Sequence, residues 1–122
     1  MVADDAPFVR ELLKGAFQSF GCVCVGEAED GQEAIEIFQK TLPDLVLLDL
    51  IMPLKSGLDA VQEMKEIWSE SVLIACTSLD QEPLLKKALN MGFNGFLVKP
   101  FTKNDLQDIM KTYFPQVKEA AR

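Results

Sequence analysis

Short apolar runs alternate with amphipathic stretches along this 122-residue sequence. Four of the runs are almost continuously apolar, namely Cys22–Val25, Leu45–Leu48, Val72–Cys76 and Phe96–Val98. Such runs are typical of strands buried on both faces, as in a parallel sheet covered by helices. A further strand is predicted at Met1–Ala3. Because three residues are few for a central strand, a start upstream of Met1 stays open.

Between these runs, apolar residues recur at three- and four-residue spacing, which predicts five amphipathic helices. The expected inward faces are Phe8, Val9, Leu12, Leu13, Ala16, Phe17 and Phe20; Ala34, Ile35 and Phe38; Leu58, Val61, Met64 and Ile67 or Trp68; Leu84, Leu85, Ala88 and Leu89; and Leu106, Ile109, Met110 and Tyr113. Pro7 and Pro83 suit a first helical turn, and Thr102 with Asp105 resembles a capping box. Strands alternating with helices predict an α/β fold with a parallel sheet.

Length and composition bound the fold further. A chain of this length is one ordinary domain, residues 1–122, and 48% hydrophobic residues suffice for one core. No apolar run approaches the roughly 20 residues that span a bilayer, and Asp4 and Asp5 stand where a signal peptide would be basic and then apolar. Three cysteines, Cys22, Cys24 and Cys76, are an odd and sparse set for disulfides. We therefore expect a cytoplasmic protein, with Cys22 and Cys24 sharing one buried face of a strand.

Charge and residue types exclude several kinds of chemistry. The net charge is −7, whereas nucleic-acid binding depends on basic patches, so no direct nucleic-acid contact is expected. The sequence contains no histidine, which excludes Ser-His-Asp and Cys-His nucleophiles and imidazole-ligated zinc. The chemistry must therefore rest on carboxylates, hydroxyls, lysines and the backbone.

Polar residues follow the carboxyl ends of four of the predicted strands. They are Asp4 and Asp5, Asp49, Thr77 and Ser78, and Lys99. In open α/β sheets the ligand crevice lies at these ends, where the strand order reverses. For a flavodoxin-like order, 2-1-3-4-5, that point falls between the first and third strands, so Asp5 and Asp49 would face each other.

Three carboxylates in one crevice repel one another unless a cation offsets their charge. Mg²⁺ suits such an all-oxygen site and accepts phosphate oxygens as well. With a hydroxyl and an ammonium nearby, the set matches what phosphoryl transfer to a carboxylate nucleophile requires. Taken singly, Asp4 and Asp5 could instead be helix caps, Asp49 a turn residue, Thr77 a strand-end residue and Lys99 a solvated side chain.

The ordered segments resemble the receiver domain of two-component response regulators over essentially the whole chain. They are the acid pair in Val2–Asp5, Leu45–Pro53 with Gly57 behind it, Ile74–Ser78 and Phe96–Phe101. The resemblance implies the doubly wound fold, with a five-stranded parallel sheet and five helices on its two faces. It implies Asp49 as phosphoacceptor, Mg²⁺ held by Asp4, Asp5, Asp49 and the Ile51 carbonyl, and contacts from Thr77 and Lys99 to the phosphoryl group. It also implies a cis peptide between Lys99 and Pro100.

The same resemblance implies a signalling protein rather than an enzyme with an external substrate. A sensor histidine kinase, a phosphotransfer protein or a small phosphodonor would phosphorylate Asp49. Thr77 and Phe96, at the family's aromatic switch position, would then alter the face formed by the fourth helix, fifth strand and fifth helix, where a target protein docks. The expected docking residues are Lys86, Lys87, Asn90, Lys103 and Gln107. A homodimer formed on phosphorylation stays open, and no membrane partner is expected.

Apolar residues stand at two positions that influence phosphate lifetime in this family. They are Ile51, two residues past the phosphoacceptor, and Leu79, two past the switch threonine, so a long-lived phosphate is expected. Other interpretations are a receiver excised from a transcription regulator or hybrid kinase, and a phosphorylation-independent interaction module. A phosphatase of the haloacid dehalogenase type would need a second aspartate where Ile51 stands, and a flavodoxin-like protein would place a flavin phosphate among carboxylates.

Overall fold

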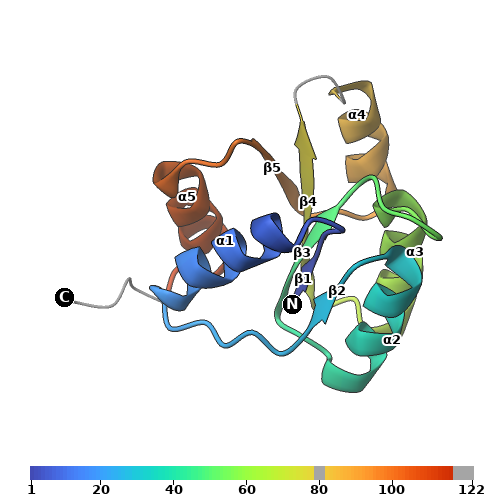
Figure 1. Cartoon of the computed structure of the whole chain (residues 1–122), viewed down its shortest axis with the longest axis horizontal. Helices are drawn as coiled ribbons and strands as arrows, with labels where there is room; N and C mark the ends of the chain where they lie inside the picture. The colour runs from blue at the N-terminus through green and yellow to red at the C-terminus, as the bar shows by residue number, and fades with distance from the viewer. Residues whose placement is uncertain (79–81, 117–122) are drawn as a thin grey trace.

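The computed structural model describes residues 1–78 and 82–116 and contains five strands and five helices (Figure 1). In chain order they are β1 Val2–Ala3, α1 Pro7–Gln18, β2 Glu27–Ala28, α2 Gly31–Thr41, β3 Leu45–Asp49, α3 Gly57–Ile67, β4 Val72–Ser78, α4 Glu82–Met91, β5 Gly95–Lys99 and α5 Lys103–Tyr113. All strand pairs are parallel, and the sheet order is β2-β1-β3-β4-β5. The predicted flavodoxin-like doubly wound fold is therefore confirmed.

Helices cover both faces of the sheet, as parallel strands with crossover connections require. Helices α1 and α5 lie on one face, and α2, α3 and α4 lie on the other (Figure 1). Within the described ranges, no helix combines the length and the apolar character needed to cross a membrane.

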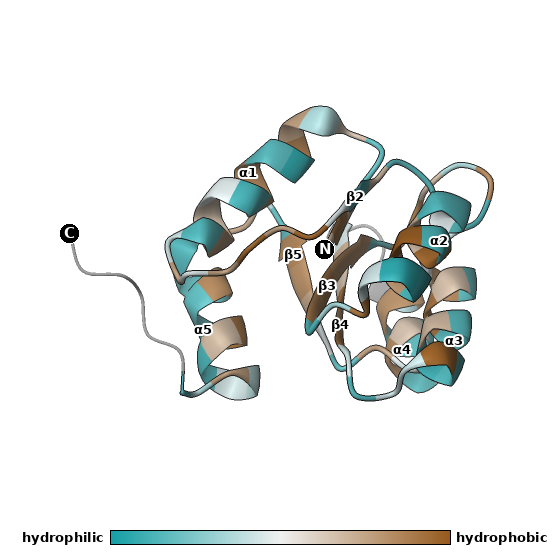
Figure 2. Cartoon of the chain, turned by 90° about the horizontal axis from the view of Figure 1, so that it is seen from below, coloured by the Kyte–Doolittle hydropathy of each residue, from teal (hydrophilic) through white to brown (hydrophobic). Residues whose placement is uncertain are grey.

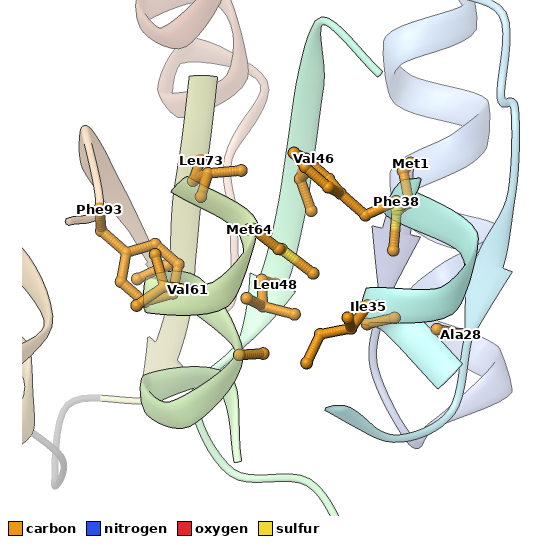
Figure 3. Packing of buried hydrophobic residues seen from close by; sticks show 14 of the residues in the cluster. Met1, Ala28, Ile35, Phe38, Val46, Leu48, Val61, Met64, Leu73 and Phe93 are labelled. Carbon is orange, nitrogen blue, oxygen red and sulfur yellow. The ribbon is translucent and has the colours of Figure 1, made fainter. Parts of the chain in front are cut away.

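The core consists of two apolar layers, one on each side of the sheet (Figure 2). In the layer beneath α2, α3 and α4, Phe38 and Met64 pack with Val46 and Leu48 of β3, all with no exposed surface (Figure 3). In the other layer, Phe17 of α1 packs near Leu97, Ile109 and Met110. Burial of each such large side chain contributes about 1.5–3 kcal/mol, so the central strands are held firmly from both faces.

Helix starts follow the sequence signals closely. Pro7 opens α1, and the Ser56 hydroxyl accepts a hydrogen bond from the Asp59 amide at the start of α3. The predicted capping box at α5 is present, because the side chains of Thr102 and Asp105 each accept from the other's backbone amide. These caps fix where each helix leaves the carboxyl edge of the sheet.

The prediction of a strand at Cys22–Val25 is wrong, since the second strand is Glu27–Ala28. Strand β2 pairs with β1, whose register places Val2 opposite Glu27, so the ladder begins after the apolar run. The run itself is largely exposed, with Val23 80% accessible. The expectation that Cys22 and Cys24 share a buried face also fails: Cys22 is partly buried, whereas Cys24 is exposed.

The inward face predicted for the first helix is partly wrong. Leu13 and Phe17 are buried, but Phe8 is 76% and Leu12 50% exposed. Seven apolar positions in this segment exceed what one helix can bury, and packing against α5 selects the side that carries Leu13 and Phe17. The predicted inward faces of α2 and α5 are confirmed in their main residues, including Phe38 and Ile109.

Candidate functional site

Three carboxylates meet at the carboxyl edge of the sheet. Asp4 and Asp5 follow β1, and Asp49 ends the neighbouring strand β3. One oxygen from each of the three lies within 4.8 Å of the other two. Asp4 and Asp49 are buried, whereas Asp5 is exposed and faces solvent. The strand order thus brings together the acids that the sequence separates by 44 residues or more.

Backbone amides orient the two buried carboxylates. Asp4 Oδ1 accepts a hydrogen bond from the Ala6 amide at 2.9 Å, and Asp49 Oδ1 accepts one from the Ile51 amide at 3.1 Å. The second oxygen of each carboxylate faces Lys99, whose Nζ lies 3.0 Å from Asp4 Oδ2 and 3.3 Å from Asp49 Oδ2. The ammonium group therefore bridges the two buried acids.

The electrostatics of the pocket oppose full ionisation of Asp49. Burial raises the pKa of Asp49 to about 6 and the charge of Asp4 adds to this, while the Ile51 amide and Lys99 act in the other direction. Burial alone would lower the pKa of Lys99, but its hydrogen bond to Asp4 and the charges of both acids raise it above its ordinary value. Lys99 is thus firmly cationic, and the pocket has capacity for further positive charge.

The donor set fits a hard divalent cation. Carboxylate oxygens are the ligands that Mg²⁺ prefers, and one or two carboxylates with several waters satisfy its octahedral geometry. Asp4, Asp5 and Asp49 offer such oxygens within one small volume, and the exposed Asp5 leaves a side open to water and ligand. Two buried acids that share a single lysine also indicate that an added cation would be stabilising.

A close approach of the backbone shapes the loop that follows Asp49. The Gly57 amide donates to the Leu50 carbonyl at 3.1 Å, and a Cβ at Gly57 would collide with the carbonyl oxygen of Asp49. Glycine is therefore required where α3 begins. This contact explains the presence of a glycine, Gly57, after Asp49 and Pro53 in the sequence.

Two further predicted residues, Thr77 and Phe96, lie on β4 and β5, and only Thr77 is close to the carboxyl edge of the sheet. Thr77 is buried near the end of β4, one residue past Cys76, which is the partner of Asp49 in the β3–β4 register. Its Oγ1 donates to the Ser78 carbonyl at 3.3 Å. Phe96 lies on β5 and is 44% exposed. The predicted cis peptide between Lys99 and Pro100 is present, whereas Leu79 lies outside the described residues.

Arg10 also contacts the acid pair, although no sequence pattern indicated it. Its guanidinium group donates to the carbonyl oxygen of Asp4 at 2.7 Å and also contacts Glu27 and Glu29. In the sequence Arg10 is a single cation one turn into the helix that follows the acid pair. An amphipathic pattern predicts only an ordinary exposed polar residue at this position. Only the parallel pairing of β1 with β2 brings Glu27 to it.

Comparison with known proteins gives the family of this chain. The model of the response regulator receiver domain matches residues 1–111. The chain belongs to the response regulator receiver family. Two curated relatives are chemotaxis proteins CheY: one from Halobacterium salinarum, 38% identical over 88% of this chain and 89% of its own length, and one from Thermotoga maritima, 36% identical over 83% and 84%.

Solved receiver structures have the same fold. The chain is similar to CheY in a complex with CheX, BeF3 and magnesium from Borrelia burgdorferi, with a TM-score of 0.84 and 30% identity over 92% of this chain and 86% of that one. It is also similar to the receiver domain of the response regulator NarL from Mycobacterium tuberculosis, with a TM-score of 0.82 and 30% identity over 92% of each chain. The receiver family therefore accounts for the sheet order.

Proposed function

We propose that residues 1–122 form one receiver domain that accepts a phosphoryl group on Asp49. The observation that carries this proposal is the position of the Asp49 carboxylate, which is buried at the end of β3 between an amide, an ammonium and two further acids. A carboxylate oxygen held in this way can act as nucleophile toward phosphorus while cations balance the charge of the phosphoryl oxygens.

The proposed reaction transfers a phosphoryl group without any redox change. A carboxylate oxygen of Asp49 forms the new O–P bond, the donor's N–P or O–P bond breaks, and the leaving group keeps the bonding pair and takes a proton from solvent. Asp4, Asp5, Asp49 and the Ile51 carbonyl would hold Mg²⁺, which would offset charge on the phosphoryl oxygens. Lys99 and Thr77 would contact the phosphoryl group from β5 and β4. The domain promotes only its own phosphorylation and dephosphorylation, so it is not an enzyme with an external substrate.

The proposed output is a change of surface. Thr77 moves toward the new charge, and Phe96, now 44% exposed, turns inward, which biases the face formed by α4, β5 and α5 between two states. The residues proposed to contact the target belong to α4 and α5: Lys86, Lys87, Asn90, Lys103 and Gln107. Phenylalanine at position 96 can turn inward but offers a target no hydroxyl.

The proposed partners are a histidine kinase or phosphotransfer protein that supplies the phosphoryl group, and a target protein that docks on the α4-β5-α5 face. The relative from Borrelia burgdorferi forms a complex with CheX, which supports protein partners for this chain. The cysteines are free thiols, which supports a reducing, cytoplasmic location.

Intact-mass measurement tests this proposal. The protein is incubated with phosphoramidate or acetyl phosphate and Mg²⁺, beside the Asp49→Asn variant. We expect one phosphoryl adduct that is lost in the variant and after addition of EDTA. Folded protein that forms no adduct from either donor would instead support a phosphorylation-independent interaction module.

A further inference from the structure

Arg10 joins three parts of the molecule next to the acid cluster. Its Nη1 donates to the carbonyl oxygen of Asp4 at 2.7 Å, and its Nε lies 3.2 Å from Glu27 Oε1 of β2. Its Nη2 lies 3.8 Å from Glu29. The Arg10 side chain is only 11% exposed, whereas the Glu29 side chain is 71% exposed. The three acceptors together define one orientation of the guanidinium group.

The contact with Asp4 bears on the position of the proposed metal ligands. The Asp4 amide already donates to the Ala28 carbonyl at 3.0 Å, and Arg10 holds the carbonyl side of the same residue. With both backbone groups of Asp4 bound, the peptide that links Asp4 to Asp5 has a defined orientation. That orientation decides where each carboxylate points.

We infer that Arg10 is a positioning residue for Mg²⁺ binding, acting through the Asp4 carbonyl rather than through its charge. The inference rests on the proposed function, because it concerns the metal held by Asp4, Asp5 and Asp49. Groups that orient metal ligands from outside the coordination sphere typically change metal affinity about 10–100-fold when removed.

An effect of charge and an effect of geometry predict opposite changes in Mg²⁺ affinity when Arg10 is removed. A cation near the acid cluster repels Mg²⁺, so its removal would tighten binding if charge were its main effect. If Arg10 positions the ligands, its removal weakens binding. Lysine keeps the charge but lacks the planar fork that reaches three acceptors at once, so Arg10→Lys separates the two effects.

Lys14 supplies a matched control on the same helix. Its Nζ lies 2.9 Å from Glu27 Oε2, so Lys14→Met removes one positive charge from the same ion-pair network. Lys14 contacts Glu11 and Glu27 but, within the described part of the chain, has no hydrogen bond to Asp4. Its loss should leave Mg²⁺ affinity within about twofold of the parent.

The test is an NMR titration of the full chain with Mg²⁺ for the parent, Arg10→Ala, Arg10→Lys and Lys14→Met. We expect both Arg10 variants to lose about tenfold in affinity and, without metal, to exchange the Asp4 amide hydrogen faster. At saturating Mg²⁺ their maximal rate of phosphorylation by phosphoramidate should return to within about twofold of the parent.

Two results would overturn the inference while leaving the proposed function intact. They are an Arg10→Ala variant that binds Mg²⁺ as tightly as the parent or more so, and an Arg10→Lys variant that matches the parent. A parent protein that binds no Mg²⁺ would instead refute the proposed function, and this inference with it. Circular dichroism confirms that each variant is folded before titration.

Discussion

Lys99 Nζ lies 3.3 Å from Asp49 Oδ2, and the same ammonium lies 3.0 Å from Asp4 Oδ2. One cation from the end of β5 therefore serves two buried acids from the ends of β1 and β3. Without metal, Lys99 offsets the repulsion between the two acids, and its ammonium group lies against carboxylate oxygens that the proposed Mg²⁺ would use. We therefore expect the lysine to affect stability, metal binding and phosphorylation in separate ways.

Replacement of Lys99 by methionine should change these three properties in different directions. Without metal, the variant should be about 1–2 kcal/mol less stable to urea, because two buried acids lose their counter-ion; the partial exposure of Lys99 keeps this below the cost of breaking a fully buried pair. The variant should bind Mg²⁺ more tightly than the parent, because a competing cation is gone. It should nevertheless be phosphorylated more slowly. Weaker Mg²⁺ binding would contradict this account of Lys99.

Asp49 should make stability depend on pH in the metal-free protein. Its pKa is raised from 3.8 to about 6, mainly by burial, so the folded state holds this proton more tightly than the unfolded chain. The contribution of this proton to the free energy of unfolding is fully present below about pH 3.8 and is lost as pH rises through about 6. Urea unfolding measured between pH 4 and 7 should show this decline in stability in the parent and not in Asp49→Asn. Added Mg²⁺ should lower the pH at the midpoint of the decline. Equal slopes for the two proteins would contradict the prediction.

The phosphorylated protein should lose its phosphate slowly. Ile51 is 52% exposed two residues after Asp49, the proposed phosphoacceptor, and its apolar side chain cannot orient an attacking water. Ile51→Asn should speed hydrolysis by up to about tenfold, less than the hundredfold or more that a general base gives. Loss of the adduct is followed by intact mass. Leu54→Asn is the control, since Leu54 is an exposed residue of the same loop; rapid loss from the parent itself would refute the prediction.

The amino-terminal edge of the sheet offers a separate test of stability. A cavity of about 610 Å³ lies there, with Val23–Val25 on one wall and Pro43–Leu45 on another. Because Val2 pairs with both Glu27 and Leu47, a residue placed before Met1 would lie between Val25 and Leu45 and continue β1. Three apolar residues joined there should raise the free energy of unfolding by about 1–2 kcal/mol, after the ordering cost is subtracted.

The control for this extension is a chain with three Gly-Ser-type residues at the same place, which adds length without apolar surface. Thermal unfolding compares the two. Equal midpoints would show that added residues do not enter the cavity. The extension should leave Mg²⁺ binding unchanged, because the acid cluster lies at the opposite edge of the sheet.

Sequence patterns predicted the central elements well because burial on both faces leaves little ambiguity. The runs around Val46 and Ile74 contain no polar residue on either face, which indicates interior strands, and both residues are buried. Predicted helix ends at Pro7 and Thr102 rest on local hydrogen bonding and ring geometry, which the sequence contains in full. The acid cluster followed from the same reasoning, since parallel strands end at one edge.

The failures concern features set by distant partners. The apolar run Cys22–Val25 satisfies a strand pattern, but pairing depends on the extent of β1, which only the assembled sheet reveals. The exposure of Phe8 depends on where α5 packs against α1. Arg10 was missed for a similar reason, because its acceptors are Asp4, just after β1, and Glu27 of β2, and no local pattern links them.

The most direct test of the central claim is to locate the phosphoryl group. Borohydride reduces an aspartyl phosphate to homoserine with release of phosphate, so reduction of the phosphorylated protein marks the modified residue permanently. Peptide mass mapping should then find homoserine at position 49 and aspartate unchanged at positions 4 and 5. Homoserine at Asp4 or Asp5, or unmodified Asp49 in protein that carries the adduct, would contradict the account.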